Sequence, residues 1–165
     1  MKSSRRHESL IPLSREHHYG LMLCLRIHRR LPLHRDDGAW LRAKAAQTVE
    51  FFSMDLTAHF KAEEDALFPA MRGFSGASIL LNELISEHRE LERLAEQLGG
   101  AEVAQLAEAL VRFADLLEAH IRKEERDLFP LYEEQAANDL AAKVGRAIRD
   151  YVGDAIQPRD PELLK

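Results

Sequence analysis

Cysteine is almost missing from this sequence, since Cys24 is the only one among 165 residues. A single thiol excludes an internal disulfide and is typical of a reducing compartment. No apolar run is long enough to span a bilayer, and nothing near the start resembles the apolar stretch of a signal peptide. We therefore expect a soluble, cytoplasmic protein with no membrane partner.

An excess of positive charge is also missing. Lys and Arg number 23 against 28 Asp and Glu, which gives a net charge of -5 and a pI of about 5.9. This balance argues against nucleic acid as the main partner. There is no Ser–His–Asp or Cys–His arrangement, no phosphate-binding loop and no zinc-finger spacing. The sequence therefore leaves open whether the protein is an enzyme.

Strand-like alternation is absent as well, and helical periodicity dominates. We predict helices over 14–30, 39–71, 77–98 and 101–136, and a shorter one over 139–152. Ser14 is a natural N-cap, Pro32 and Gly38 break the chain after the first helix, and Gly99-Gly100 end the third. Short connections favour antiparallel neighbours, so the expected fold is all-α, an up-down-up-down four-helix bundle with an additional C-terminal helix.

The length of the chain suits one domain. We place it at 1–157, with a core over 12–136, an accessory helix over 139–152 and a flexible tail over 158–165.

One local pattern occurs twice. His59 and Glu63 are followed by Leu-Phe-Pro at 67–69, and His120 and Glu124 are followed by Leu-Phe-Pro at 128–130. A spacing of four residues puts both side chains of each pair on one helix face. A surface ion pair would explain one copy, but repetition in the same context favours two halves of one site.

Apolar periodicity shows where these pairs point. The fourth helix carries a regular apolar row at intervals of three and four residues, and His120 and Glu124 continue it: Leu106, Leu110, Phe113, Leu117, His120, Glu124, Leu128. The second helix repeats the intervals: Ala45, Val49, Phe52, Leu56, His59, Glu63, Leu67. These rows are typical of core-facing positions. His88 lies on the row of the third helix, and His17 on that of the first, where His18 is the competing candidate.

Four histidines and two glutamates facing the core would be costly without compensation. Two cations remove the difficulty if the glutamates bridge them and the imidazoles complete each coordination sphere. Nitrogen and oxygen ligands without thiolate suit iron or manganese, and imidazole also accepts zinc. Because structural zinc prefers four closed ligands, the set favours two iron ions, with manganese or zinc as substitutes. The predicted metal ligands are His17, His59, Glu63, His88, His120 and Glu124.

This pattern resembles the hemerythrin-like HHE cation-binding domain over about residues 12–136. The resemblance implies a four-helix bundle that holds a non-heme di-iron centre with an oxygen-derived bridge. Two differences separate the chain from the invertebrate oxygen carriers of that family. Leu84 stands where they have a second histidine on the third helix, and Glu124 stands at a four-residue interval where they have aspartate one residue further on. The chain is more similar to bacterial HHE proteins tied to oxygen, iron or nitric-oxide stress.

The leading functional hypothesis is therefore a cytoplasmic di-iron protein that binds, senses or reacts with oxygen or a related small molecule such as peroxide or nitric oxide. Its expected partner is that small ligand, and a homodimer is compatible with the sequence. The alternatives are an iron- or oxygen-responsive regulatory or interaction module, and a structural helical bundle without obligatory metal. The physiological ligand is not specified by the residues.

Three other groups of residues have simpler interpretations. His28 lies about 16 Å along the first helix from His17 and is interpreted as a core or end-of-bundle histidine. Glu64 and Glu125 are turned about 100° around their helices from the proposed ligands, which predicts solvated or outer roles. Cys24 is interpreted as an inert core residue.

Overall fold

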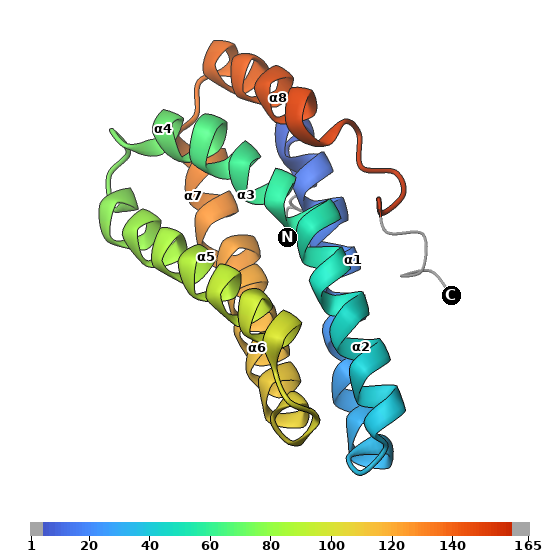
Figure 1. Ribbon diagram of the computed structural model, residues 1–165. Coiled ribbons are helices and arrows are strands. Elements are labelled where there is room, and N and C mark those ends of the chain that lie inside the picture. Colours follow the sequence, from blue (N-terminus) through green and yellow to red (C-terminus); the bar gives the residue numbers. More distant parts are fainter. Residues whose placement is uncertain (1–4, 160–165) are drawn as a thin grey trace.

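The computed structural model describes residues 5–159, and all regular elements within that range are helical. Four long segments run up and down, and a shorter helix crosses one end of them (Figure 1). In chain order the elements are η1 (Glu8–Leu10), α1 (Ile11–His34), α2 (Gly38–Phe51), η2 (Phe52–Leu56), α3 (Thr57–Ala62), η3 (Glu63–Leu67), α4 (Phe68–Met71), α5 (Ala77–Gly100), α6 (Val103–Lys123), η4 (Glu124–Leu128), α7 (Phe129–Gln135) and α8 (Asn138–Val152). The predicted all-α bundle is confirmed.

Several predicted helix ends were wrong. The first helix begins at Ile11 and includes Ser14, whose hydroxyl donates to Glu125 at 2.7 Å in place of capping the helix. The same helix passes through Pro32, which is exposed and close to the C-terminal end, so its ring faces solvent and only the final turn is affected. Gly99 and Gly100 form the last turn of α5, and the chain leaves the helix at Ala101.

The second and fourth long segments each contain a wide π-helical turn that begins at a glutamate of the repeat. The N–H of Phe68 donates to the carbonyl of Glu63, and the N–H of Phe129 donates to that of Glu124. The residue after each phenylalanine is a proline, which has no N–H and whose ring crowds the carbonyl four residues earlier. A five-residue turn accommodates that ring without ending the helix. The Leu-Phe-Pro endings therefore shape the backbone directly at Glu63 and Glu124.

A third wide turn, η2, changes which residues of the second segment face the core. The predicted row placed Val49 and Phe52 inward, but both are only half-buried, whereas Phe51 and Asp55 are buried. The extra residue in the turn rotates the helix face, so a regular count of three and four residues fails across it. The row predicted for the fourth segment has no such interruption before the site and is buried throughout. The row predicted for the third segment is also buried throughout: Leu81, Leu84, His88, Leu91, Ala95, Leu98.

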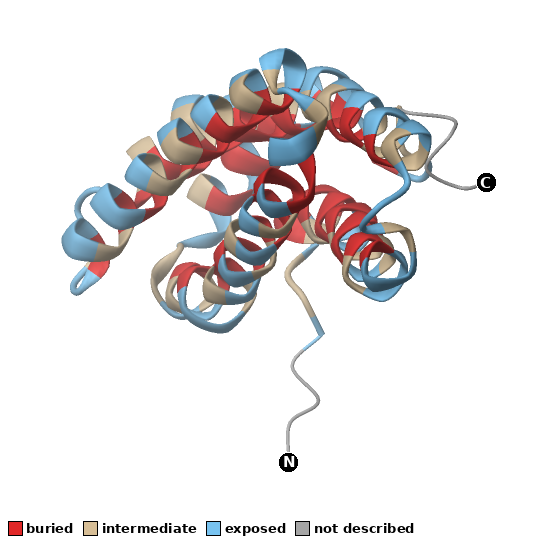
Figure 2. Cartoon of the chain, turned by 60° about the horizontal axis from the view of Figure 1, so that its bottom comes forward, coloured by how far each residue is buried: buried red, intermediate tan, exposed pale blue. Residues whose placement is uncertain are grey.

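Two apolar clusters make up the core, one on each side of a polar layer. The cluster nearest the α1–α2 and α5–α6 connections includes Leu23, Phe51, Leu91 and Leu117. The other lies beneath α8 and α4 and includes Leu13, Leu67, Leu84, Leu128 and Ile148. The residues between the two clusters are His17 on the first long segment, His88 on the third, and the His–Glu pairs of the repeat on the second and fourth. Figure 2 shows that the buried residues lie on the inward faces of the helices.

Helix α8 closes one end of the bundle, where it packs against η1, α3, η3 and α1. After α8 the chain returns along α1, and the hydroxyl of Tyr19 donates to the carbonyl of Ile156 at 2.6 Å. The N–H of Arg159 then donates to the carboxylate of Asp55 at 2.8 Å. Of the tail predicted to be flexible, residues 160–165 lie outside the described range. No helix within residues 5–159 is long and apolar enough to cross a membrane.

We predict that Cys24 resists thiol reagents while the protein is folded. The side chain is buried, and burial together with nearby Glu118 raises the thiol pKa to about 12. At pH 8 the thiolate fraction is then about 10⁻⁴, against roughly a quarter for an unperturbed cysteine. Reaction with a chromogenic disulfide should be slowed more than about a thousandfold relative to the guanidinium-unfolded chain. Equal rates in the two states would show that the thiol is accessible.

Candidate metal centre

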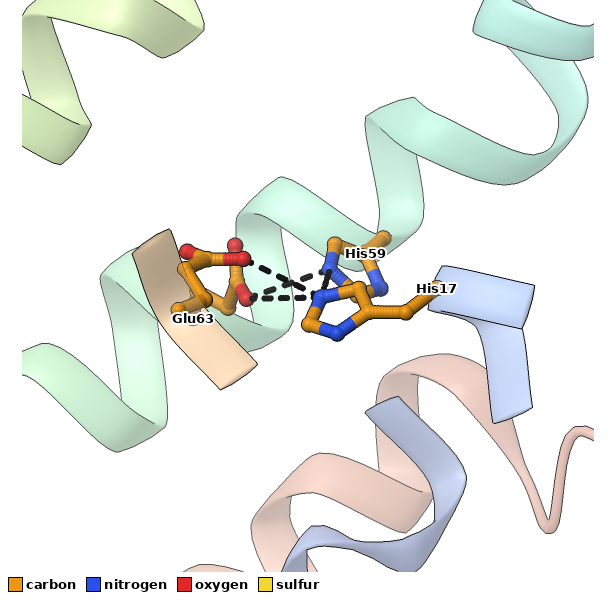
Figure 3. A group of neighbouring side chains, drawn as sticks. His17, His59 and Glu63 are labelled. Carbon is orange, nitrogen blue, oxygen red and sulfur yellow. Dashed lines mark hydrogen bonds and ion pairs between the residues drawn. The ribbon is translucent and has the colours of Figure 1, made fainter. Parts of the chain in front are cut away.

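All six predicted ligands meet in the polar layer between the two apolar clusters. Each is buried, with exposed fractions of 0–3%. They come from four different segments: His17 from α1, His59 and Glu63 from α3 and η3, His88 from α5, and His120 and Glu124 from α6 and η4. Figure 3 shows the imidazoles of His17 and His59 facing the carboxylate of Glu63. The competing candidate His18 is exposed and lies outside this cluster.

The cluster divides into two overlapping sets of four residues, each with its ligand atoms within 4.8 Å of one another. His17 and His59 belong to one set and His88 and His120 to the other, whereas Glu63 and Glu124 belong to both. We call these sets the first half-site (His17, His59) and the second half-site (His88, His120).

Each glutamate directs one oxygen to each half-site. Oε1 of Glu63 lies 3.1 Å from Nε2 of His59, and its Oε2 lies 3.2 Å from Nε2 of His88. Oε2 of Glu124 lies 3.0 Å from Nε2 of His17, and its Oε1 lies 3.3 Å from Nε2 of His120. A carboxylate placed in this way can bridge two cations, one on either side.

Each of the four imidazoles has its own glutamate on the side of the ring that faces away from the cluster, and we call these four groups the outer carboxylates. Nδ1 of each ring lies at hydrogen-bond distance from a glutamate oxygen, as follows: His17 from Glu125 at 2.7 Å, His59 from Glu16 at 2.9 Å, His88 from Glu64 at 2.7 Å and His120 from Glu87 at 2.8 Å. Because an ionised carboxylate only accepts, Nδ1–H is the donor in each pair. The outer carboxylate therefore fixes both the tautomer and the orientation of its ring.

The donor set inside the cluster fits a cation. With the proton on Nδ1, Nε2 of a neutral imidazole carries a lone pair. Nε2 of His17 lies 3.1 Å from Nε2 of His59, and the corresponding atoms of His88 and His120 are 3.2 Å apart. Lone pairs at such distances repel each other and the nearby carboxylate oxygens. A cation in each half-site would turn this repulsion into coordination by nitrogen and oxygen.

The two inner carboxylates supply a second sign that a cation is needed. The four oxygens of Glu63 and Glu124 have no hydrogen-bond donor while the histidine Nε2 atoms beside them are unprotonated, although both side chains are fully buried. A buried acceptor without a donor costs about 1–3 kcal/mol, and a charged one costs more. Coordination to metal would satisfy all four oxygens at once.

Protons compete with a cation for this cluster. Burial lowers the pKa of the four imidazoles, but the facing carboxylates outweigh it, so the pKa values of His17, His59 and His88 are raised and that of His120 reaches about 10 beside Glu124. Burial raises the pKa of Glu124, yet His120 and His17 lower it to well below its usual range. The two buried carboxylates require positive charge beside them, either as protons on the imidazoles or as bound metal. A metal ion would have to displace the protons in order to bind.

Aromatic rings restrict the histidines further. Phe60 stacks on His88 with ring centroids 3.8 Å apart, and Phe129 stacks on His17 at 5.3 Å. Phe68 also stacks on His88, with ring centroids 5.7 Å apart. The phenylalanines of both Leu-Phe-Pro endings therefore lie against imidazoles of the cluster.

His28 lies outside the cluster, as expected from its position along α1. It is partly exposed, and its Nε2 lies 3.4 Å from Asp115 and 3.6 Å from Glu118. Glu64 and Glu125 have the outer position that the helical angle predicted. The sequence reasoning missed Glu16 and Glu87 as partners of His59 and His120. One sequence signal for these two glutamates was present, because each directly precedes a predicted ligand in a Glu-His dipeptide, at 16–17 and at 87–88.

Comparison with known proteins agrees with this arrangement. The family model described as "Hemerythrin HHE cation binding domain" matches residues 12–132. The chain belongs to this hemerythrin family. The resemblance predicted from the repeated motif is confirmed, and the matched range contains all six clustered residues and the four outer carboxylates.

One curated relative of this hemerythrin-like chain is a DNA nickase of Nostoc sp. (strain PCC 7120). It is 38% identical over 77 residues, which cover 46% of this chain and 22% of the relative. The chain thus spans about a fifth of the length of that protein. No solved structure matches significantly.

We predict that a shared glutamate and an unshared histidine affect metal content differently. Glu63→Gln keeps the side-chain volume but removes the charge that serves both half-sites, so both ions should bind at least about 10-fold more weakly. His59→Ala removes a ligand of the first half-site alone and should leave about one ion per chain tightly bound. Metal titration followed by desalting and elemental analysis would measure both. Equal losses in the two variants would contradict the division into half-sites.

Proposed function

We propose that this protein is a non-heme di-iron hemerythrin-like protein that binds, senses or reacts with oxygen or a related small molecule such as peroxide or nitric oxide. The observation that carries the proposal is the placement of Glu63 and Glu124, each with one oxygen in each half-site. Membership of the hemerythrin HHE family supports metal binding at these residues.

The choice of iron follows from the kinds of donor atom. The two half-sites offer imidazole nitrogens and carboxylate oxygens, and no thiol belongs to either. Such sets suit iron and manganese, and zinc remains a substitute because imidazole accepts it. Bound iron would supply the electron transfer to or from a small ligand that the protein side chains lack.

The protein's own residues would hold, orient and shield the ions. The outer carboxylates keep Nε2 of each histidine directed inward, which raises its basicity as a ligand. The two apolar clusters on either side exclude water from the layer, so charges inside it interact more strongly than at the surface.

Burial also limits the size of the ligand. The six clustered residues are 0–3% exposed, so a molecule larger than a few atoms has no direct contact with them. A surface cavity of about 450 Å³ is lined by Glu64 and Phe68, both of which touch His88. These two side chains lie between that cavity and His88 of the second half-site.

A regulatory function is the second candidate, and a specific contact favours it. Arg159, which follows α8, pairs with Glu16, and Glu16 holds His59. Metal occupancy could therefore change how the segment after α8 is held. The activity of the Nostoc nickase is not extended to this chain, because the similarity covers 22% of that protein and the net charge of -5 does not favour DNA.

Anaerobic loading with ferrous iron followed by exposure to air would test the proposal. We expect about two iron ions per chain and a new visible absorption after air, since the two half-sites share their bridging carboxylates. Fewer than about one iron per chain, with no change of absorption in air, would exclude a di-iron centre. Glu63→Gln provides the matched protein without the shared carboxylate.

We predict selection by ligand size in the iron-loaded protein. Azide and benzoate carry the same charge, but only azide is small enough to reach a layer whose residues are almost fully buried. Azide should change the visible spectrum in a saturable way, and benzoate should leave it unchanged at the same concentration. A similar response to both anions would show that the layer is more open than its burial indicates.

A further inference from the structure

Every outer carboxylate is itself paired with a cation. In four places a cation contacts a glutamate that in turn contacts a histidine. These chains of contacts are Arg6–Glu125–His17, Arg159–Glu16–His59, Arg89–Glu64–His88 and Lys123–Glu87–His120. Each glutamate uses one oxygen for the cation and the other for the imidazole. The outer charge of the layer is thereby balanced, and each carboxylate is held from two sides.

The two half-sites differ in where these cations come from. Arg89 belongs to α5 and Lys123 to the last turn of α6, so the second half-site is supported from within the bundle. The first half-site is supported by Arg6, which precedes η1, and by Arg159, which follows α8. We call the stretches 5–7 and 153–159 the flanking segments.

Arg6 is held by several groups beside the first half-site. Its guanidinium pairs with Glu125 at 2.6 Å and with Glu133 at 3.0 Å, and it lies over the ring of Phe129 with 4.9 Å to the centroid. Phe129 in turn stacks on His17. Arg6 therefore contacts two of the groups that orient one imidazole.

Arg159 neutralises the most buried of the outer carboxylates. Glu16 is 6% exposed, compared with 19–29% for the side chains of Glu64, Glu87 and Glu125. Nη1 of Arg159 lies 2.8 Å from Oε1 of Glu16, and Oε2 of the same carboxylate lies 2.9 Å from Nδ1 of His59. The backbone N–H of Arg159 donates to the carboxylate of Asp55, and this hydrogen bond fixes where the guanidinium of Arg159 lies.

We propose that Arg6 and Arg159 are positioning residues for the first half-site, and that the flanking segments thereby control how tightly this half-site retains its metal. The inference rests on the proposed metal-binding function. Without Arg159, His59 is the one remaining ion-pair or hydrogen-bond partner of the Glu16 side chain shown within residues 5–159. The carboxylate of Glu16 can then turn, which frees the imidazole of His59 to rotate. By thermodynamic reciprocity, metal in the first half-site must also stabilise the flanking segments.

Metal release to excess ferrous chelator measures this control. Arg159→Gln should release half of the bound iron about 10-fold faster, because changing a group behind a ligand costs about 10–100-fold in affinity. Arg159→Lys keeps the charge and should restore most of the slow release. Arg6→Gln should act on the same half of the iron as Arg159→Gln.

Arg89→Gln is the matched control, since Arg89 has the equivalent position behind the second half-site. Arg89→Gln should accelerate release of the other half of the bound iron. The double variant with Arg89→Gln and Arg159→Gln should therefore release all of the iron faster. If both substitutions act on the same half, or if Arg159→Gln releases iron at the wild-type rate, the inference is wrong.

Hydrogen exchange provides a readout that does not depend on release. Loading with ferrous iron under anaerobic conditions should slow exchange in residues 153–159 of the wild-type chain, and Arg159→Gln should remove that protection while the helices stay protected. Unchanged exchange in this segment on loading would overturn the coupling. A wild-type chain that retains no iron would instead contradict the proposed function, so the two failures are distinguishable.

Discussion

The structure depends on the burial of two carboxylates at the middle of a helical bundle. Glu63 and Glu124 are fully buried, and their oxygens have no hydrogen-bond donor while the neighbouring Nε2 atoms are unprotonated. Such a layer is tolerated only where positive charge enters it, as protons on the histidines or as metal ions. Burying this polar layer lowers the free energy of unfolding. The two apolar clusters offset that loss, since each buries large aliphatic and aromatic side chains on one side of the layer.

The backbone is adapted to that layer at two equivalent places. A wide turn that begins at Glu63 or Glu124 precedes the proline of each Leu-Phe-Pro ending and accommodates its ring. The phenylalanine of each ending then packs on an imidazole. A short motif thus supplies the clustered His–Glu pair, the wide turn in the helix and an aromatic ring that packs on an imidazole.

The layer has approximate twofold symmetry in its inner atoms and loses it further out. The same types of residue surround both half-sites, and each histidine has one outer glutamate. The cations behind those glutamates lie on helices for the second half-site and on the flanking segments for the first. Two chemically similar positions are thereby connected to different parts of the fold, one to helices and one to the segments that flank them.

The helical class and the six clustered residues follow from the sequence alone, because periodicity and the repeated pair reflect local geometry, and the resemblance of the motif to a known domain indicates the family. The fourth segment shows this best, since every residue of its predicted row is buried. Across η2 the same reasoning failed, because one extra residue per turn rotates the face and leaves no mark in the spacing. The three-dimensional arrangement was needed to show that Glu16 contacts His59 and that Glu87 contacts His120. It was also needed to show that Arg6 and Arg159 both lie behind the first half-site. Those contacts join residues 33 to 143 positions apart in the chain, and no local rule relates them.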